Sequence, residues 1–241
     1  RFVTIRFRIV FPVVKGATMT IPILETTTEN RLLEQLLRSP RLPVVAERLS
    51  ALVAYETARR QHFIDTVSES EKAEFINGEK VVHSPAKFKH TAAVGNLYRL
   101  LSTYAVIHDL GWVGIEKVLI SLTRNDYEPD ICFFNAATAA TFQPDQMRFP
   151  APDLAVEVLS ASTEANDRGI KFEDYAAHGV AEYWLINPDT ETVEQHRLSG
   201  NGYELVMKAQ TGELHSTIIP GFVIPVRAIF DDAINRAALA Q

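Results

Sequence analysis

The chain lacks most of the features that assign a protein to a class at first sight. One cysteine among its 241 residues excludes a disulfide framework and a cysteine-based zinc site. No apolar run reaches the roughly 18 residues of a membrane span. A net charge of −6 argues against a surface that is basic all over, so any contact with nucleic acid must be local. The cysteine usage fits a reducing compartment, and we expect a cytoplasmic protein with no membrane partner.

Common catalytic signatures are missing as well. The sequence has no GxSxG elbow, no glycine-rich phosphate loop and no HExxH motif, and its seven histidines lack metal-ligand spacing. The opening RFVTIRFRIVFPVV has no compact apolar region or cleavage site of a signal peptide. Because the first methionine is Met19, we assign residues 1–18 to an upstream or added segment and leave it out of the functional argument.

Two acidic residues stand in apolar segments where a carboxylate is hard to explain structurally. Asp130 opens the run DICFF, and Glu157 lies in DLAVEVLS, a nearly continuous apolar run typical of a central buried strand. A carboxylate there loses hydration worth several kcal/mol unless a cation or hydrogen-bond donors compensate it. Two such residues predict one shared cation, and carboxylate oxygens suit Mg²⁺.

A second set of polar residues recurs at intervals of four in DRGIKFEDYAAHGV. Helical periodicity places Asp167, Lys171 and Tyr175 on one face. Packed against the strand of Glu157, this face would supply an ammonium group for charge that develops on a phosphate. The alternative is an ordinary helix surface, with i,i+4 pairs of about 0.2–0.5 kcal/mol each. The adjoining acidic strands favour the catalytic interpretation.

These segments resemble the small restriction endonuclease family of the PD-(D/E)XK nuclease superfamily. The resemblance runs from EFINGEKVVHSP through EPDICFF, PDLAVEVLSAST and DRGIKFEDYAAHGVAEYWLINP to IIPGFVIP, about two thirds of the chain. Pro129 and Asp130 match the first half of the signature, and Glu157 matches the acidic residue of the second half. Leu159 stands where the superfamily has its lysine. This family is known for a lysine that has migrated to the following helix, which here is Lys171.

The resemblance implies a metal-dependent endonuclease that hydrolyses phosphodiester bonds, with DNA as the expected substrate. Asp130, Glu157 and the backbone carbonyl of Val158 would bind Mg²⁺, or Mn²⁺ in its place. Lys171 would contact the scissile phosphate, or position and deprotonate the attacking water if its pKa falls.

Supporting roles are expected for three further residues. His90 stands where the family's first core helix begins, at a position that often carries an acid in this fold. Tyr175 would orient Lys171 or touch the substrate backbone, and Asp167 would share its helix face.

The best basic stretch comes just before and within that first helix. It contains Lys80, Lys87 and Lys89, which would bind nucleic-acid phosphates, although a solvated surface is the commoner role of such lysines. Glu116 and Glu79 are weaker acidic candidates for the site. The single cysteine, Cys132, is expected to be a buried core thiol.

The expected fold class is α/β, with a restriction-endonuclease-like core. We predict a central mixed sheet of about five strands between the two helices of the site, a helical extension over 19–68, and a nuclease-like domain over 69–241. The expected elements are helices within 29–62, a hairpin turn at Asn77–Gly78, a helix over 88–107, a strand over 113–122, strands over 128–134 and 153–160, a short helix near 136–142, one helix over 162–178, a strand over 182–187 and a hairpin around 199–202.

Two other functions are compatible with the same residues. A catalytically silent member of the fold would bind nucleic acid or a protein partner through the N-terminal helices. A metal-dependent hydrolase of a small phosphoester would need one phosphate contact, whereas nucleic acid needs a track of several, so the basic patch beside the site distinguishes them. The frequency of symmetric dimers, and the gain of two sites for a duplex cutter, favour a homodimer.

Overall fold

The computed structural model describes residues 27–68 and 70–240. The predicted segment 1–18, and the start of the predicted extension at residue 19, lie outside these residues. The chain separates into two compact units between Ala54 and Tyr55. The first unit contains α1 (Thr27–Leu37) and the beginning of α2 (Leu42–Thr66), so its described part is helical, as expected. No helix in the described ranges is long and apolar enough to cross a membrane.

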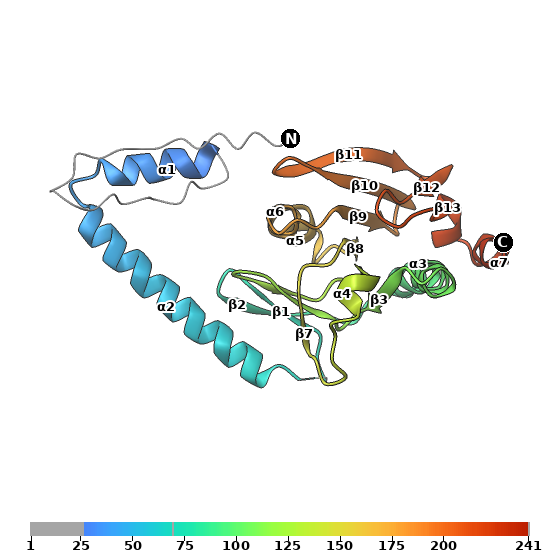
Figure 1. Ribbon diagram of the computed structural model, residues 1–241, viewed down its shortest axis with the longest axis horizontal. Helices are drawn as coiled ribbons and strands as arrows, with labels where there is room; N and C mark the ends of the chain where they lie inside the picture. Colours follow the sequence, from blue (N-terminus) through green and yellow to red (C-terminus); the bar gives the residue numbers. More distant parts are fainter. Residues whose placement is uncertain (1–26, 69, 241) are drawn as a thin grey trace. The chain divides into compact units, whose positions relative to one another are not determined.

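The second unit begins at Tyr55, within α2 and before the predicted domain start at residue 69. It is built on a mixed six-stranded sheet in the order β11-β10-β9-β8-β6-β3 (Figure 1), which confirms the predicted α/β class. In this sheet β8 and β9 run parallel and the other neighbours antiparallel. The strands are β3 (Gly111–Ile115), β6 (Ile131–Asn135), β8 (Leu154–Val158), β9 (Glu182–Asn187), β10 (Thr192–Ser199) and β11 (Gly202–Ala209).

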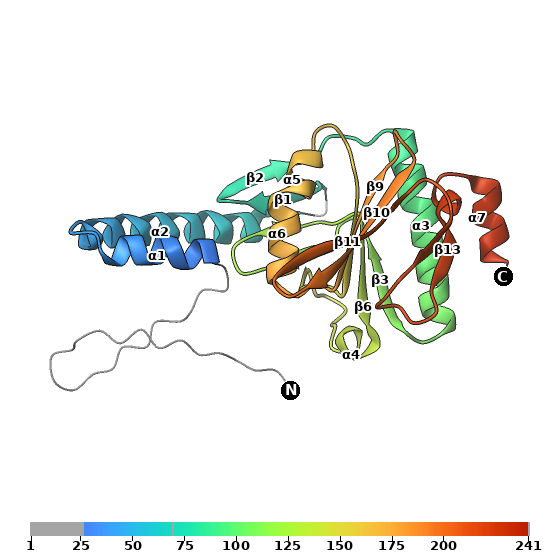
Figure 2. The ribbon, with the colours of Figure 1, turned by 90° about the horizontal axis from the view of Figure 1, so that it is seen from above.

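Helices and short elements complete this unit. Figure 2 shows α3 and α6 on opposite sides of the six-stranded sheet. The elements are α3 (Phe88–Ile107), α4 (Ala136–Ala139), α5 (Glu164–Arg168), α6 (Ile170–Ala177), β12 (Glu213–His215), β13 (Val223–Pro225), the 3-10 helix η1 (Val226–Ile229) and α7 (Asp232–Leu239).

Alternate residues of the central strands pack on opposite sides of the sheet, as strand geometry requires. Phe133 and Val156 belong to the core that α3 covers. Cys132 lies in the other core, which includes residues of α6, so the thiol is buried as predicted. Asp130 and Glu157 share the alternation of this second set. The pleat therefore aims both carboxylates at the side of the sheet that carries α6.

A second sheet, in the order β2-β1-β5-β4-β7, was not predicted. Its strands are β1 (Ala73–Ile76), β2 (Glu79–Val82), β4 (Leu119–Ser121), β5 (Asp126–Tyr127) and β7 (Arg148–Phe149). The predicted hairpin turn between β1 and β2 is confirmed, because Asn77 and Gly78 have φ values of 49° and 86°, the left-handed pair that a tight hairpin requires.

Two predictions of continuous elements are wrong. The single strand expected over 113–122 is broken at Glu116, whose φ of 60° is left-handed, so β3 and β4 enter different sheets. The single helix expected over 162–178 is divided into α5 and α6 at Gly169, which has the non-helical angles φ −109° and ψ −103°. A Cβ there would lie 2.8 Å from the carbonyl oxygen of Ala165, so the break requires a glycine.

Candidate active site

Asp130 and Glu157 stand opposite each other on neighbouring chain segments. The pairing of Ile131 with Val156, continued by one residue, sets the two acids side by side on one face. Asp130 lies immediately before β6 rather than inside a strand, and it is 4% exposed. Its Oδ2 accepts a hydrogen bond of 2.8 Å from the backbone N–H of Val158. That bond fixes the orientation of the Asp130 carboxylate.

The predicted meeting of Glu157 with the helix lysine is present. Lys171 Nζ lies 3.0 Å from Glu157 Oε1, 3.1 Å from Asp167 Oδ1 and 2.8 Å from Glu74 Oε1. Burial lowers the pKa of Lys171, but these carboxylates outweigh it and raise the pKa well above its usual value. These ion pairs favour the charged form of Lys171, and the lowered pKa expected beside a bound metal stays a prediction.

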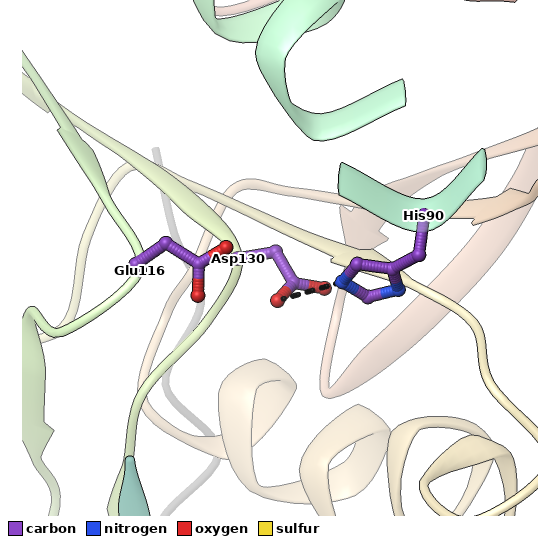
Figure 3. Close-up of side chains that lie close together, drawn as sticks. All are labelled: His90, Glu116 and Asp130. Carbon is purple, nitrogen blue, oxygen red and sulfur yellow. Dashed lines mark ion pairs between the residues drawn. The ribbon is translucent and has the colours of Figure 1, made fainter. Parts of the chain in front are cut away.

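A second cluster of side chains surrounds the other carboxylate oxygen of Asp130, Oδ1. Figure 3 shows Asp130 between Glu116, from the turn after β3, and His90, from the first turn of α3. Each offers one ligand atom, and these atoms all lie within 4.8 Å of one another. His90 Nε2 is 3.5 Å from Asp130 Oδ1. Lys72 Nζ lies 2.7 Å from the same oxygen and 3.0 Å from Glu116 Oε2.

The two clusters border one cavity of about 670 Å³. Its walls include His90, Glu116, Asp130, Glu157 and Lys171. The structure thus brings both predicted acids, the predicted lysine and the predicted histidine to a single cavity that is large enough for a substrate group.

Carboxyl groups outnumber ammonium groups around this cavity. The acids that pair with Lys72 or Lys171 are Glu74, Glu116, Asp130, Glu157 and Asp167, and Glu128 also lines the cavity. Burial raises the pKa of Glu128 to about 7. Burial also raises the pKa of Glu157, Lys171 opposes this, and the neighbouring carboxylates raise it further. The donor set of two carboxylates and an imidazole at Asp130 fits a divalent cation, which would supply the missing positive charge.

The three predicted phosphate-binding lysines occupy different places. Lys87 is exposed and lines the cavity, and Lys89 lines it while pairing with Asp189. Lys80, on β2, pairs with Glu71 and lines a different, smaller pocket beside α2. Only part of the predicted basic stretch therefore lies at the site.

Two other candidates, Tyr175 and Glu79, do not line the cavity. The Tyr175 hydroxyl is buried and has no hydrogen-bond partner within the described residues, so it does not orient Lys171 through a hydrogen bond. Its ring packs instead between those of Tyr127 and Tyr183. Glu79 is paired with Arg59 at the surface.

Sequence reasoning missed Lys72 and Glu74. Glu74 stands among the apolar residues of AEFI and is 1% exposed, so the argument for buried acids applies to it as well. Lys72 follows SESE, a Ser- and Glu-rich stretch that is typical of a linker and gives no sign of a site. Its place beside Asp130 depends on the pairing of β1 with β5, for which the sequence carries no local signal.

Comparison with known proteins places this architecture in a family. The model of the Uma2 family, described as "Putative restriction endonuclease", matches residues 58–227. The chain belongs to the Uma2 family. This match confirms the resemblance inferred from the sequence motifs and supports a nuclease, and the family boundaries fall within the second unit, which carries the cavity.

One solved structure supports the fold of this Uma2 protein. A crystal structure from Anabaena variabilis, described as a putative nuclease, aligns with a TM-score of 0.61 at 17% identity, covering 73% of this chain and 96% of that one. The type IIG restriction endonuclease BpuSI aligns with a TM-score of 0.35 at 15% identity, covering 66% of this chain and 18% of that one, which is too distant to support an argument. No curated protein gives a significant match.

Proposed function

We propose that this Uma2 protein is a Mg²⁺-dependent endonuclease that hydrolyses phosphodiester bonds in DNA, with Mn²⁺ able to replace Mg²⁺. The observation that carries the proposal is the juxtaposition of Asp130 and Glu157 over one cavity, each held in place by a buried contact. Family membership supports nuclease chemistry. The acid-rich surroundings support a cation, because buried carboxylates without compensation are costly.

Asp130, Glu157 and the Val158 carbonyl, with Glu116 and His90 nearby, are the groups that would hold the cation. When bound, it would stabilise charge on the phosphate and lower the pKa of a water molecule. The protein's own contribution is preorganisation. The Val158 N–H orients Asp130, and Lys171 orients Glu157, so neither carboxylate has to be reorganised during the reaction.

Lys171 acts in this scheme by positioning Glu157, with Asp167 sharing its charge. The phosphate contacts come from the cavity rim, where Lys87 and Lys89 precede and begin α3. Their ammonium groups would neutralise phosphates on either side of the scissile bond. Because a duplex has two strands to cut, we also propose that the active form is a homodimer.

The test is cleavage of supercoiled plasmid, single-stranded DNA and RNA by the purified chain. We expect plasmid cleavage with Mg²⁺ or Mn²⁺ and none when a chelator removes the metal. Equal cleavage in the chelator would refute the metal dependence. A protein that binds DNA but cuts none of the three substrates would instead be a catalytically silent module. Hydrolysis of a small aryl phosphate alone would indicate a phosphoesterase.

A further inference from the structure

The ammonium group of Lys72 occupies the space between two potential metal ligands. Its Nζ lies 2.7 Å from Asp130 Oδ1 and 3.0 Å from Glu116 Oε2. Metal–oxygen bonds for Mg²⁺ and its relatives are about 2.0–2.6 Å long. A cation bound to both oxygens would need the volume that Nζ fills, so the ammonium and the metal cannot share this position.

The surroundings of Lys72 leave it room to move. Its side chain is 20% exposed and lines the cavity, so the cavity is open to its ammonium. Lys171 differs, since its side chain is 2% exposed and three carboxylates engage its ammonium from as many elements. Within the described residues, the site therefore contains one lysine held in the core by three carboxylates and one, Lys72, whose ammonium pairs with two carboxylates of the cluster that would bind the metal.

We propose that Lys72 holds the divalent-cation position of the metal-free protein and yields it when the cation binds, its ammonium moving into the cavity. Lys72 is thus a positioning residue, which keeps Asp130 and Glu116 together until the metal replaces it. The inference rests on the proposed function only for the identity of the cation. It also predicts that the protein binds metal less tightly than its carboxylates alone would allow, because binding must displace a positive charge.

The test is calorimetric titration of the metal-free protein with Mn²⁺ at fixed pH, with Lys72→Met as the main variant. Removing the competing charge should tighten Mn²⁺ binding by about tenfold or more. Lys87→Met is the matched control, because Lys87 lies on the same cavity but outside the Asp130 cluster, and it should change the affinity by about twofold at most. Mn²⁺ affinity of Lys72→Met equal to or weaker than that of the parent would overturn the proposal.

Thermal denaturation guards against a folding defect in the variant. Without metal, Lys72→Met should melt at a lower temperature than the parent, because Asp130 and Glu116 lose their cation. Saturating Mn²⁺ should then raise its melting temperature more than it raises that of the parent. Lys72→Gln keeps hydrogen-bond donors without the charge, and its melting temperature should change in the same directions. A smaller rise in melting temperature with Mn²⁺ than in the parent would contradict the exchange.

These results separate the two proposals. Tighter Mn²⁺ binding by Lys72→Met in a protein that cuts no nucleic acid would refute the proposed function and leave the cation exchange standing. Metal-dependent cleavage by the parent, together with an unchanged Mn²⁺ affinity of Lys72→Met, would refute the cation exchange and leave the proposed function standing.

Discussion

At the scale of single residues, a buried acid in an apolar strand has more than one explanation. Glu157 lines a cavity and contacts Lys171, whereas Glu182, in the equally apolar EYWLIN, is fully buried and has its carboxylate satisfied by hydrogen bonds. The Glu182 carboxylate accepts from Gln195, Ser216 and the Thr217 backbone. The sequence signal is the same in both strands. What differs is the set of partners, which comes from distant parts of the chain.

Replacing Lys171 tests its place in the core. Lys171→Met would leave Glu74, Glu157 and Asp167 buried without their cation, so we expect a loss of about 3–5 kcal/mol in the free energy of unfolding, measured with urea. Lys87→Met should lie within about 0.5 kcal/mol of the parent, as is usual at exposed sites. A loss below about 1 kcal/mol for Lys171→Met would mean that the ion pairs are not maintained in solution.

At the scale of elements, helices and turns with local sequence signals were predicted well, whereas the pairing of strands from distant segments was not. The α3 boundaries at Phe88 and Ile107 match the prediction because an apolar stripe and flanking turn residues define them. The Asn77–Gly78 turn was predictable because this residue pair favours the backbone conformation of a two-residue hairpin turn. The second sheet, and with it Lys72, depends on contacts between segments far apart in sequence. The candidate site was accordingly predicted for Asp130 and Glu157 and missed for the residues of the β1 region.

The break between α5 and α6 gives a prediction with an internal control. Gly169→Ala would press a methyl group against the Ala165 carbonyl, and we expect destabilisation by about 1–3 kcal/mol in urea unfolding. Gly95→Ala, inside α3, meets no atom within 4 Å and should stabilise the protein by about 0.5–1 kcal/mol. If the two substitutions had equal effects, the kink would not depend on a glycine.

At the scale of the whole second unit, ion pairs join its layers and make stability depend on pH. Arg168, at the end of α5, binds Glu194 of β10 with contacts of 2.8 and 3.0 Å. The hydrogen bonds from Arg168 lower the pKa of Glu194 to about 2, although partial burial opposes this. Because the folded-state pKa is depressed, this stabilisation is present above the usual glutamate pKa and is lost as pH falls toward 2.

Comparing the parent with Glu194→Gln checks this linkage. Near neutral pH the variant should unfold at a lower urea concentration than the parent. Its free energy of unfolding should be lower by about 1 kcal/mol, the order expected for a partly exposed ion pair. The difference should shrink as pH falls from about 4.5 to about 2, because the parent's carboxylate becomes protonated. A difference that stays constant over that range would assign the effect to packing rather than to charge.

The cavity at Asp130 depends on features at all three scales, because the β6–β8 register and Lys171 of α6 together place its acidic residues. The most direct measurement is the rate of plasmid cleavage across a Mg²⁺ titration for the parent, Asp130→Asn and Glu182→Gln. Both substitutions remove one buried carboxylate, but only Asp130 lines the cavity. We predict that Asp130→Asn reduces the rate by about 10²-fold or more at every Mg²⁺ concentration, while correctly folded Glu182→Gln keeps the parent's Mg²⁺ dependence. Cleavage by Asp130→Asn at the parent's rate and Mg²⁺ dependence would contradict the assignment of this cavity as the active site.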